Sequence, residues 1–147
     1  MESRAKFLGH PIHQMLIVFP LGLLATAVII DVIYLAGESL IFAEVAYYLV
    51  IAGLIGGALA GPFGLIDWLA TPHGTRGKRV GAMHGIGDVV VMLLFLVSAV
   101  LRADLPSEPS VLAYVCSFAG AGIALVTAWL GGELVDRLGI GVSDGAN

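Results

Sequence analysis

Residues 45–66 read VAYYLVIAGLIGGALAGPFGLI, a run that contains no charged side chain. A helix needs about 20 apolar residues to cross the hydrocarbon core of a bilayer. The run is also apolar on every side, whereas a helix on the surface of a soluble protein keeps a polar face. This stretch therefore predicts a transmembrane helix, and it decides the fold class.

Three further segments have the same character, so the chain is expected to contain four spans. We place them at about residues 14–36, 42–69, 80–101 and 109–133. The composition agrees, because 59% of the 147 residues are hydrophobic and 12% are charged, whereas soluble domains are about one quarter charged. We expect a single all-α domain over residues 1–147, a polytopic four-helix bundle in the lipid bilayer.

The lysines and arginines predict how the bundle is oriented. Six of the seven fall on one side of a four-span protein: Arg4, Lys6, Arg76, Lys78, Arg79 and Arg137. Only Arg102 falls on the other side. Basic residues accumulate on the cytoplasmic side of membrane proteins, so we expect both termini in the cytoplasm. The basic residues form no broad patch, and we expect no nucleic-acid partner.

Small residues recur at four-residue spacing in two of the spans, where they let helix backbones approach closely. One stripe lies in the second span and the other in the fourth: Gly53, Gly57 and Gly61, then Gly120, Ala124, Ala128 and Gly132. Packing inside the bundle is the first interpretation, and a homo-oligomer interface is the alternative. Gly81 and Gly85 are expected to leave space beside His84.

Ionisable residues inside a span indicate a functional site by default. His13, Asp67, His84 and Glu133 come from four different spans, and the topology places all of them near the cytoplasmic end. Pro11 is expected to begin the first helix, with His13 in its first turn and His10 just outside it. Convergence of these residues predicts one shared site.

The position of each residue along its helix suggests its chemical form. His13 and His84 are placed near helix N-termini, where a neutral imidazole, the ligand form, is favoured. Asp67 and Glu133 are placed near C-terminal ends, where a carboxylate requires a cation, a metal or a donor. His84 and Asp88 are four residues apart on one helix face. A cluster without ligand, with His13 bonded to Glu133 and His84 to Asp67, is the alternative.

At the opposite end, Asp31 and Arg102 are expected to form a structural ion pair that ties the first span to the third. Each lies 18 positions after a histidine, His13 in one case and His84 in the other. Residues 64–69 also loosely echo residues 132–137. These spacings predict two repeated helical hairpins in parallel orientation, related by an axis along the membrane normal.

The motifs of this chain resemble those of the bacterial membrane-protein family called domain of unknown function 2231. The resemblance rests on Gly9-His10-Pro11-Ile12-His13 with Phe19-Pro20-Leu21-Gly22, on Gly64-Leu65-Ile66-Asp67-Trp68, on Gly74-Thr75-Arg76 with His84, and on Gly131-Gly132-Glu133-Leu134-Val135 with Gly139-Ile140-Gly141-Val142. It implies a four-span protein of the bacterial inner membrane. Some relatives are joined to Rieske-type iron–sulfur domains, which implies redox chemistry and a redox partner protein. The family pattern has proline and histidine where this chain has Gln14 and Val18.

Two interpretations of the cluster stay open. In the first, His13 and His84 hold a b-type haem, or they bind a divalent transition metal together with His10, Asp67 and Glu133. In the second, the protein is a non-enzymatic accessory protein, or one for proton or ion permeation, and its cluster is structural. No serine or cysteine nucleophile has a placed base, so nothing in the sequence supports hydrolysis. Whether the chain is an enzyme of another kind stays open.

Overall fold

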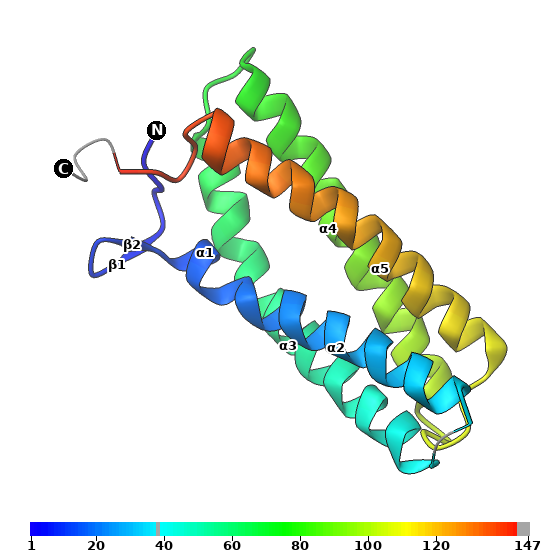
Figure 1. Cartoon of the computed structure of the whole chain (residues 1–147). Coiled ribbons are helices and arrows are strands. Elements are labelled where there is room, and N and C mark those ends of the chain that lie inside the picture. The colour runs from blue at the N-terminus through cyan, green and yellow to red at the C-terminus, as the bar shows by residue number, and fades with distance from the viewer. Residues whose placement is uncertain (38, 144–147) are drawn as a thin grey trace.

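The chain folds into four long helices that run together as one bundle (Figure 1). The computed structural model describes residues 1–37 and 39–143, so residues 38 and 144–147 of the predicted domain lie outside the described residues. Each of the four spans is long and apolar enough to cross a membrane. The predicted fold class, an all-α four-span membrane protein, is confirmed.

The first span consists of α1 (Ile12–Leu16) and α2 (Val18–Leu35), and the second is α3 (Ile41–Ala70). The third is α4 (Arg76–Arg102). The fourth is α5 (Val111–Gly132), which continues into a π-helical turn, η1 (Glu133–Arg137). The predicted bounds lie within two residues of these except at two places: α4 begins four residues before residue 80, and the fourth span continues four residues past residue 133. Hydropathy missed the polar first turn of α4, which Thr75 caps by accepting a hydrogen bond from the Lys78 amide at 3.1 Å.

Before the first helix the chain forms a small antiparallel hairpin, which the sequence interpretation did not include. Its strands are β1 (Lys6–Phe7) and β2 (His10–Pro11). Leu8 and Gly9 form the turn and both have positive φ, 49° and 87°, as two-residue hairpin turns require. Pro11 is the N-cap of α1 and not its first residue, so that prediction was wrong by one position.

The N-terminus and the last described residues, 139–143, lie at the same end of the bundle (Figure 1). We call this end, with the connection at residues 71–75, the terminal end. The opposite end, with the connections at residues 36–40 and 103–110, is the loop end. Between them lies an apolar layer whose buried members are Leu24, Ala27, Val50, Val91, Phe95 and Ala99. Most of the remaining large apolar side chains are exposed, as expected for surfaces that face lipid.

Glycines of both stripes serve packing within the chain. A Cβ added at Gly53 would lie 2.6 Å from the Leu24 side chain, and one at Gly57 would lie 2.5 Å from Sδ of Met92. Gly120 is equally close to a neighbour, since a Cβ there would lie 2.9 Å from the Phe95 ring. Interior packing is thus the role of these three glycines. Gly61 and Gly132 have open space beside them.

Candidate functional site

His84, in α4, lies between two hydrogen-bond acceptors. Its Nδ1 is 2.9 Å from the carbonyl oxygen of Thr127 in α5, and because a carbonyl can only accept, Nδ1 carries the proton. Its Nε2 is 3.2 Å from Oδ2 of Asp88, one turn further along α4. The ring therefore joins a backbone carbonyl of one helix to a carboxylate of another.

The depth of His84 differs from the prediction. It lies eight residues after Arg76, about 12 Å into the helix at 1.5 Å per residue. The field of a helix terminus acts mainly within the first turn, so the reason for expecting a neutral imidazole does not apply. His84 and Asp88 are both partly buried, with side-chain exposures of 18% and 33%.

His13, in α1, has a similar backbone contact but no carboxylate beside it. Its Nδ1 donates to the carbonyl oxygen of Ala60 in α3 at 3.0 Å. The residue one turn after it is Ile17, whose side chain cannot accept a hydrogen bond. Within residues 1–37 and 39–143, Nε2 of His13 has no hydrogen-bond partner.

A glycine opens each of these contacts. The carbonyl of Ala60 belongs to the residue four positions before Gly64, and that of Thr127 to the residue four positions before Gly131. A side chain four residues on would lie over the carbonyl, and a Cβ added at Gly64 would lie only 2.8 Å from Cε1 of His13. At Gly131 the corresponding distance to Cε1 of His84 is 3.3 Å. Of the two glycines predicted to make this space, Gly81 packs beneath Trp68, and Gly85 has open space beside it.

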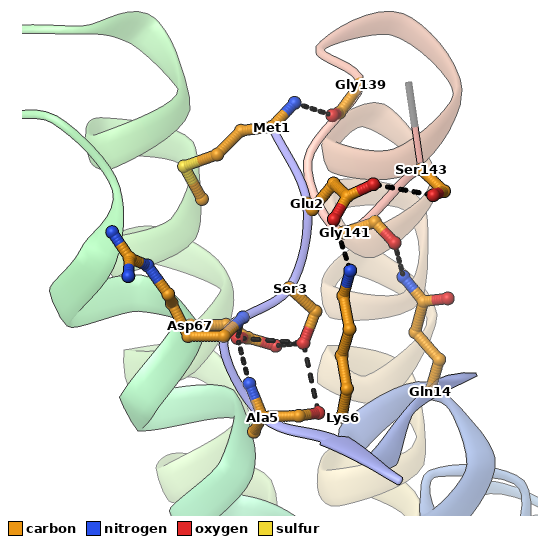
Figure 2. Close-up of polar contacts among 11 residues, drawn as sticks. Met1, Glu2, Ser3, Ala5, Lys6, Gln14, Asp67, Gly139, Gly141 and Ser143 are labelled. Carbon is orange, nitrogen blue, oxygen red and sulfur yellow. Dashed lines mark hydrogen bonds and ion pairs between the residues drawn. The ribbon is translucent and has the colours of Figure 1, made fainter. Parts of the chain in front are cut away.

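Asp67 binds the N-terminal segment and not a histidine (Figure 2). Its carboxylate accepts from the Ser3 hydroxyl at 2.7 and 2.9 Å, from the Arg4 amide at 2.6 Å and from the Ala5 amide at 3.2 Å. These donors stabilise the negative charge of Asp67, which the C-terminal end of α3 would otherwise disfavour. Asp67 therefore holds the first residues of the chain against α3.

The same segment is tied to the C-terminal residues, as Figure 2 shows. The ammonium group of Met1 donates to the carbonyl of Gly139 at 2.7 Å, and the Gly141 amide donates to the carbonyl of Met1 at 2.8 Å. Glu2 forms an ion pair with Lys6 and accepts from the Ser143 hydroxyl. Residues 1–6 and 139–143 thus form one strap across the terminal end.

Glu133 is buried and is held by two arginines. Its Oε1 is 2.5 Å from Nη2 of Arg76, at the start of α4, and its Oε2 is 3.4 Å from Nε of Arg137. Its side chain is 3% exposed, whereas both arginines are largely exposed. This ion pair joins the end of α5 to the first turn of α4.

At the loop end, Asp31 and Arg102 form a bidentate ion pair with both N–O distances at 2.7 Å. The pair was expected at this end of the bundle, and both of its side chains are 0% exposed. Nε of Arg102 also donates to the Ser98 hydroxyl at 3.1 Å and Nη2 to the Ser117 hydroxyl at 3.2 Å. The sequence interpretation missed these two serines, because single small hydroxyls inside apolar runs carry no spacing signal.

The four residues of the predicted shared site are therefore each engaged by a different partner. His13 bonds to Ala60, His84 to Thr127 and Asp88, Asp67 to the N-terminal segment, and Glu133 to two arginines. His10 lies in the exposed strand β2. In the described part of the chain, no group of three or more histidine, cysteine, aspartate and glutamate side chains is arranged to hold a metal ion. The two pairings of the ligand-free alternative do not occur either.

The fold and these contacts define a small polytopic membrane protein with ionisable side chains inside its spans. The chain belongs to the predicted membrane protein family DUF2231, domain of unknown function 2231, which it matches over residues 9–144. No curated protein and no solved structure shows significant similarity to it.

The residues that carried the family resemblance have defined places in the structure. Gly64 and Gly131 open the two imidazole contacts, and Asp67 and Glu133 anchor the strap and the start of α4. Trp68 packs against Gly81 and donates from Nε1 to the carbonyl of Lys78 at 3.1 Å. All of them lie in the half of the bundle that includes the terminal end.

Proposed function

We propose that this chain is a proton-binding membrane protein in which His84 and Asp88 together hold one exchangeable proton. The observation that carries the proposal is the position of the His84 ring between two acceptors. Nδ1 must keep its hydrogen for the carbonyl of Thr127. A second proton between Nε2 and Asp88, on either partner, turns their contact into a hydrogen bond.

Without that second proton, the lone pair of Nε2 would face a carboxylate. Two acceptors in contact repel each other, and the repulsion is poorly screened at a site that is partly withdrawn from water. The membrane setting strengthens the argument, because ionisable side chains inside spans are rare and frequently serve proton transfer. We infer that His84 and Asp88 hold this proton between them.

The apolar layer favours proton binding over conduction across the membrane. Its buried members lie between the His84–Asp88 pair and the Asp31–Arg102 pair, and all of them are apolar. Protons move along hydrogen-bonding groups, and these six side chains offer none. The proposed site therefore exchanges its proton with the terminal end only, as an accessory or sensing protein would require.

We further propose that the terminal end faces the cytoplasm of a bacterial cell and that the membrane is the inner membrane. Six basic residues lie in the segments at that end. Arg102 was the exception in the charge count, but it is buried against Asp31 and does not act as a loop charge. The positive-inside rule counts basic residues in short loops and near span ends, so its support for this orientation becomes stronger.

A cofactor site with two imidazole ligands is the second candidate, and one observation favours it. Ligating histidines almost always donate their other ring N–H to a carbonyl or carboxylate, and both His13 and His84 do so through Nδ1. The residues fit a haem incompletely, since Nε2 of His84 is taken by Asp88. The predicted metal set fits less well, since Asp67 and Glu133 are engaged elsewhere. A redox partner protein belongs to this second candidate.

The proposal is tested by nitrogen-15 NMR of histidine-labelled protein in nanodiscs, in which only four histidines give signals. In wild type, Nε2 of His84 should show the signal of a hydrogen bond to a carboxylate, and Nε2 of His13, which has the same carbonyl contact and no carboxylate, should not. Asp88→Asn should alter the Nε2 signal of His84 and leave His13 unchanged. His84 signals that do not respond to Asp88→Asn would refute the proton pair.

An optical spectrum of the same sample separates the two candidates. A Soret band that disappears in both His13→Ala and His84→Ala would favour the cofactor site. The same band retained in either variant would assign any bound haem to other residues.

A further inference from the structure

The buried positions of the two halves of the chain follow the same spacing. The buried residues of α2 are Pro20, Leu24, Ala27 and Asp31; 71 positions on are Val91, Phe95, Ser98 and Arg102, all buried in α4. Four buried residues of α3 are Ala46, Val50, Gly53 and Ala60; 67 positions on are Ala113, Ser117, Gly120 and Thr127, all buried in α5. Two offsets thus relate the interior of one hairpin to that of the other.

The contacts between helices follow the same two offsets. The contact of His13 with Ala60 corresponds to that of His84 with Thr127, since 13 + 71 = 84 and 60 + 67 = 127. Leu24 packs against Gly53, and 24 + 71 = 95 and 53 + 67 = 120 give Phe95 against Gly120. Gly64 corresponds in the same way to Gly131, one residue before the echo expected from the sequence.

The four-residue difference between the offsets arises at the loop end. From Asp31 to Ala46 the chain takes 46 − 31 = 15 residues, and from Arg102 to Ala113 it takes 113 − 102 = 11. The helices of the first hairpin extend further past the equivalent residues, because α2 ends at Leu35 and α3 begins at Ile41, whereas α4 ends at Arg102 itself and α5 begins at Val111. A single offset therefore does not describe both helices.

We infer that the chain consists of two copies of one helical hairpin. We further infer that the buried Asp31–Arg102 network makes the first hairpin pair with the second and not with another first hairpin. Both hairpins start at the terminal end, so the copies run parallel, related by an approximate two-fold axis along the bundle. Asp31 and Arg102 are equivalent positions, 71 residues apart, and they meet each other. Because these two positions are equivalent and in contact, the two-fold axis passes between them.

Charge decides which copies pair at this position. Two first hairpins would bury two carboxylates against each other, and two second hairpins would bury two guanidinium groups. Either pairing leaves like charges without compensation in a dry interior, whereas the unlike pair is neutral and fully hydrogen-bonded. The pair therefore directs the first hairpin to the second one and away from a like hairpin of another chain.

Most of the residues around Arg102 in the second hairpin have the same residue type at the equivalent position of the first hairpin. Ser98 donates to the carbonyl of Ala113 at 2.8 Å, and the equivalent residue of the first hairpin is also an alanine, Ala46. Arg102 lies 5.1 Å from the ring of Tyr114, and the equivalent residue is Tyr47. Only the two serines are missing, because Ala27 and Val50 occupy their equivalent positions.

The test is to exchange the network between the hairpins. The two-site variant carries Asp31→Arg and Arg102→Asp. The six-site variant also moves the hydroxyls, through Ala27→Ser, Val50→Ser, Ser98→Ala and Ser117→Val, and it has the same composition as the natural chain. A register control carries the same changes as the six-site variant except that its two new serines stand one residue later, through Val28→Ser and Ile51→Ser, while Ala27 and Val50 are kept. Each hydroxyl is thereby displaced by one residue along its helix.

Thermal unfolding of the full chain in detergent provides the measurement. The two-site variant should melt well below wild type, because the guanidinium group moved to position 31 would lack its hydroxyl acceptors. The six-site variant should recover more than half of that loss, and the register control should not. A six-site variant that is no more stable than the two-site variant or the register control, or that fails to fold, would overturn the inference.

Discussion

Replacement of Gly64 by alanine tests whether a glycine is required to give His13 access to the carbonyl of Ala60. The matched control is Gly131→Ala, which adds the same methyl group beside His84. The two sites have the same helix–imidazole geometry, but the space differs. The new Cβ would lie 2.8 Å from Cε1 of His13 and 3.3 Å from Cε1 of His84. We expect Gly64→Ala to destabilise the protein and Gly131→Ala to have little effect.

The magnitude follows from these distances. Ordinary van der Waals contact begins at 3.4 Å, so His13 must retreat by 3.4 − 2.8 = 0.6 Å and His84 by 3.4 − 3.3 = 0.1 Å. A retreat of this size lengthens the His13 hydrogen bond from 3.0 Å beyond hydrogen-bonding range. Loss of the bond costs about 1 kcal/mol and overpacking about 2 kcal/mol, while alanine gains about 1 kcal/mol in helix propensity. The net loss for Gly64→Ala is about 2 kcal/mol.

Two measurements check this prediction. Reversible unfolding in mixed detergent micelles gives the difference in free energy of unfolding between each variant and wild type. Nitrogen-15 NMR reports on the Nδ1–H of each imidazole, which should weaken at His13 in Gly64→Ala and persist at His84 in Gly131→Ala. Equal stability losses in the two variants, or an unchanged His13 signal in Gly64→Ala, would refute the reasoning.

Three further predictions concern other contacts. Ile17→Asp should give His13 a carboxylate one turn away, as His84 has, so that Nε2 of His13 acquires the nitrogen-15 signal of a hydrogen bond to a carboxylate; Val18→Asp, at a position exposed on the bundle surface, is the control and should not produce this change. Asp67→Asn should weaken hydrogen bonds worth about 1.5–3 kcal/mol with a charged acceptor and speed amide exchange at residues 4 and 5, while the spans stay protected; unchanged exchange would contradict this role. Reporter fusions at Gly74 and Pro106 should give opposite sidedness, and equal sidedness would rule out the four-span topology.

The imidazole sites show how far the sequence could predict the candidate site. The sequence placed His84 and Asp88 on one helix face, because residues four apart are neighbours on any α-helix, and the structure brings them into contact. The partners of Asp67 could not be predicted in this way. They are backbone amides and a hydroxyl more than 60 positions away, brought close by the fold of the N-terminal segment.

The four spans and their order could be read from the sequence, because an apolar run as long as the bilayer is thick is a local property of the chain. The rotation of each helix about its own axis could not be read from the sequence. In a soluble protein the polar face sets this rotation, but here lipid and interior are both apolar, so hydropathy does not distinguish the buried side of a span. Packing alone decides it: glycines such as Gly64 admit a neighbour, and that contact places the His13 ring on a carbonyl and not on Glu133.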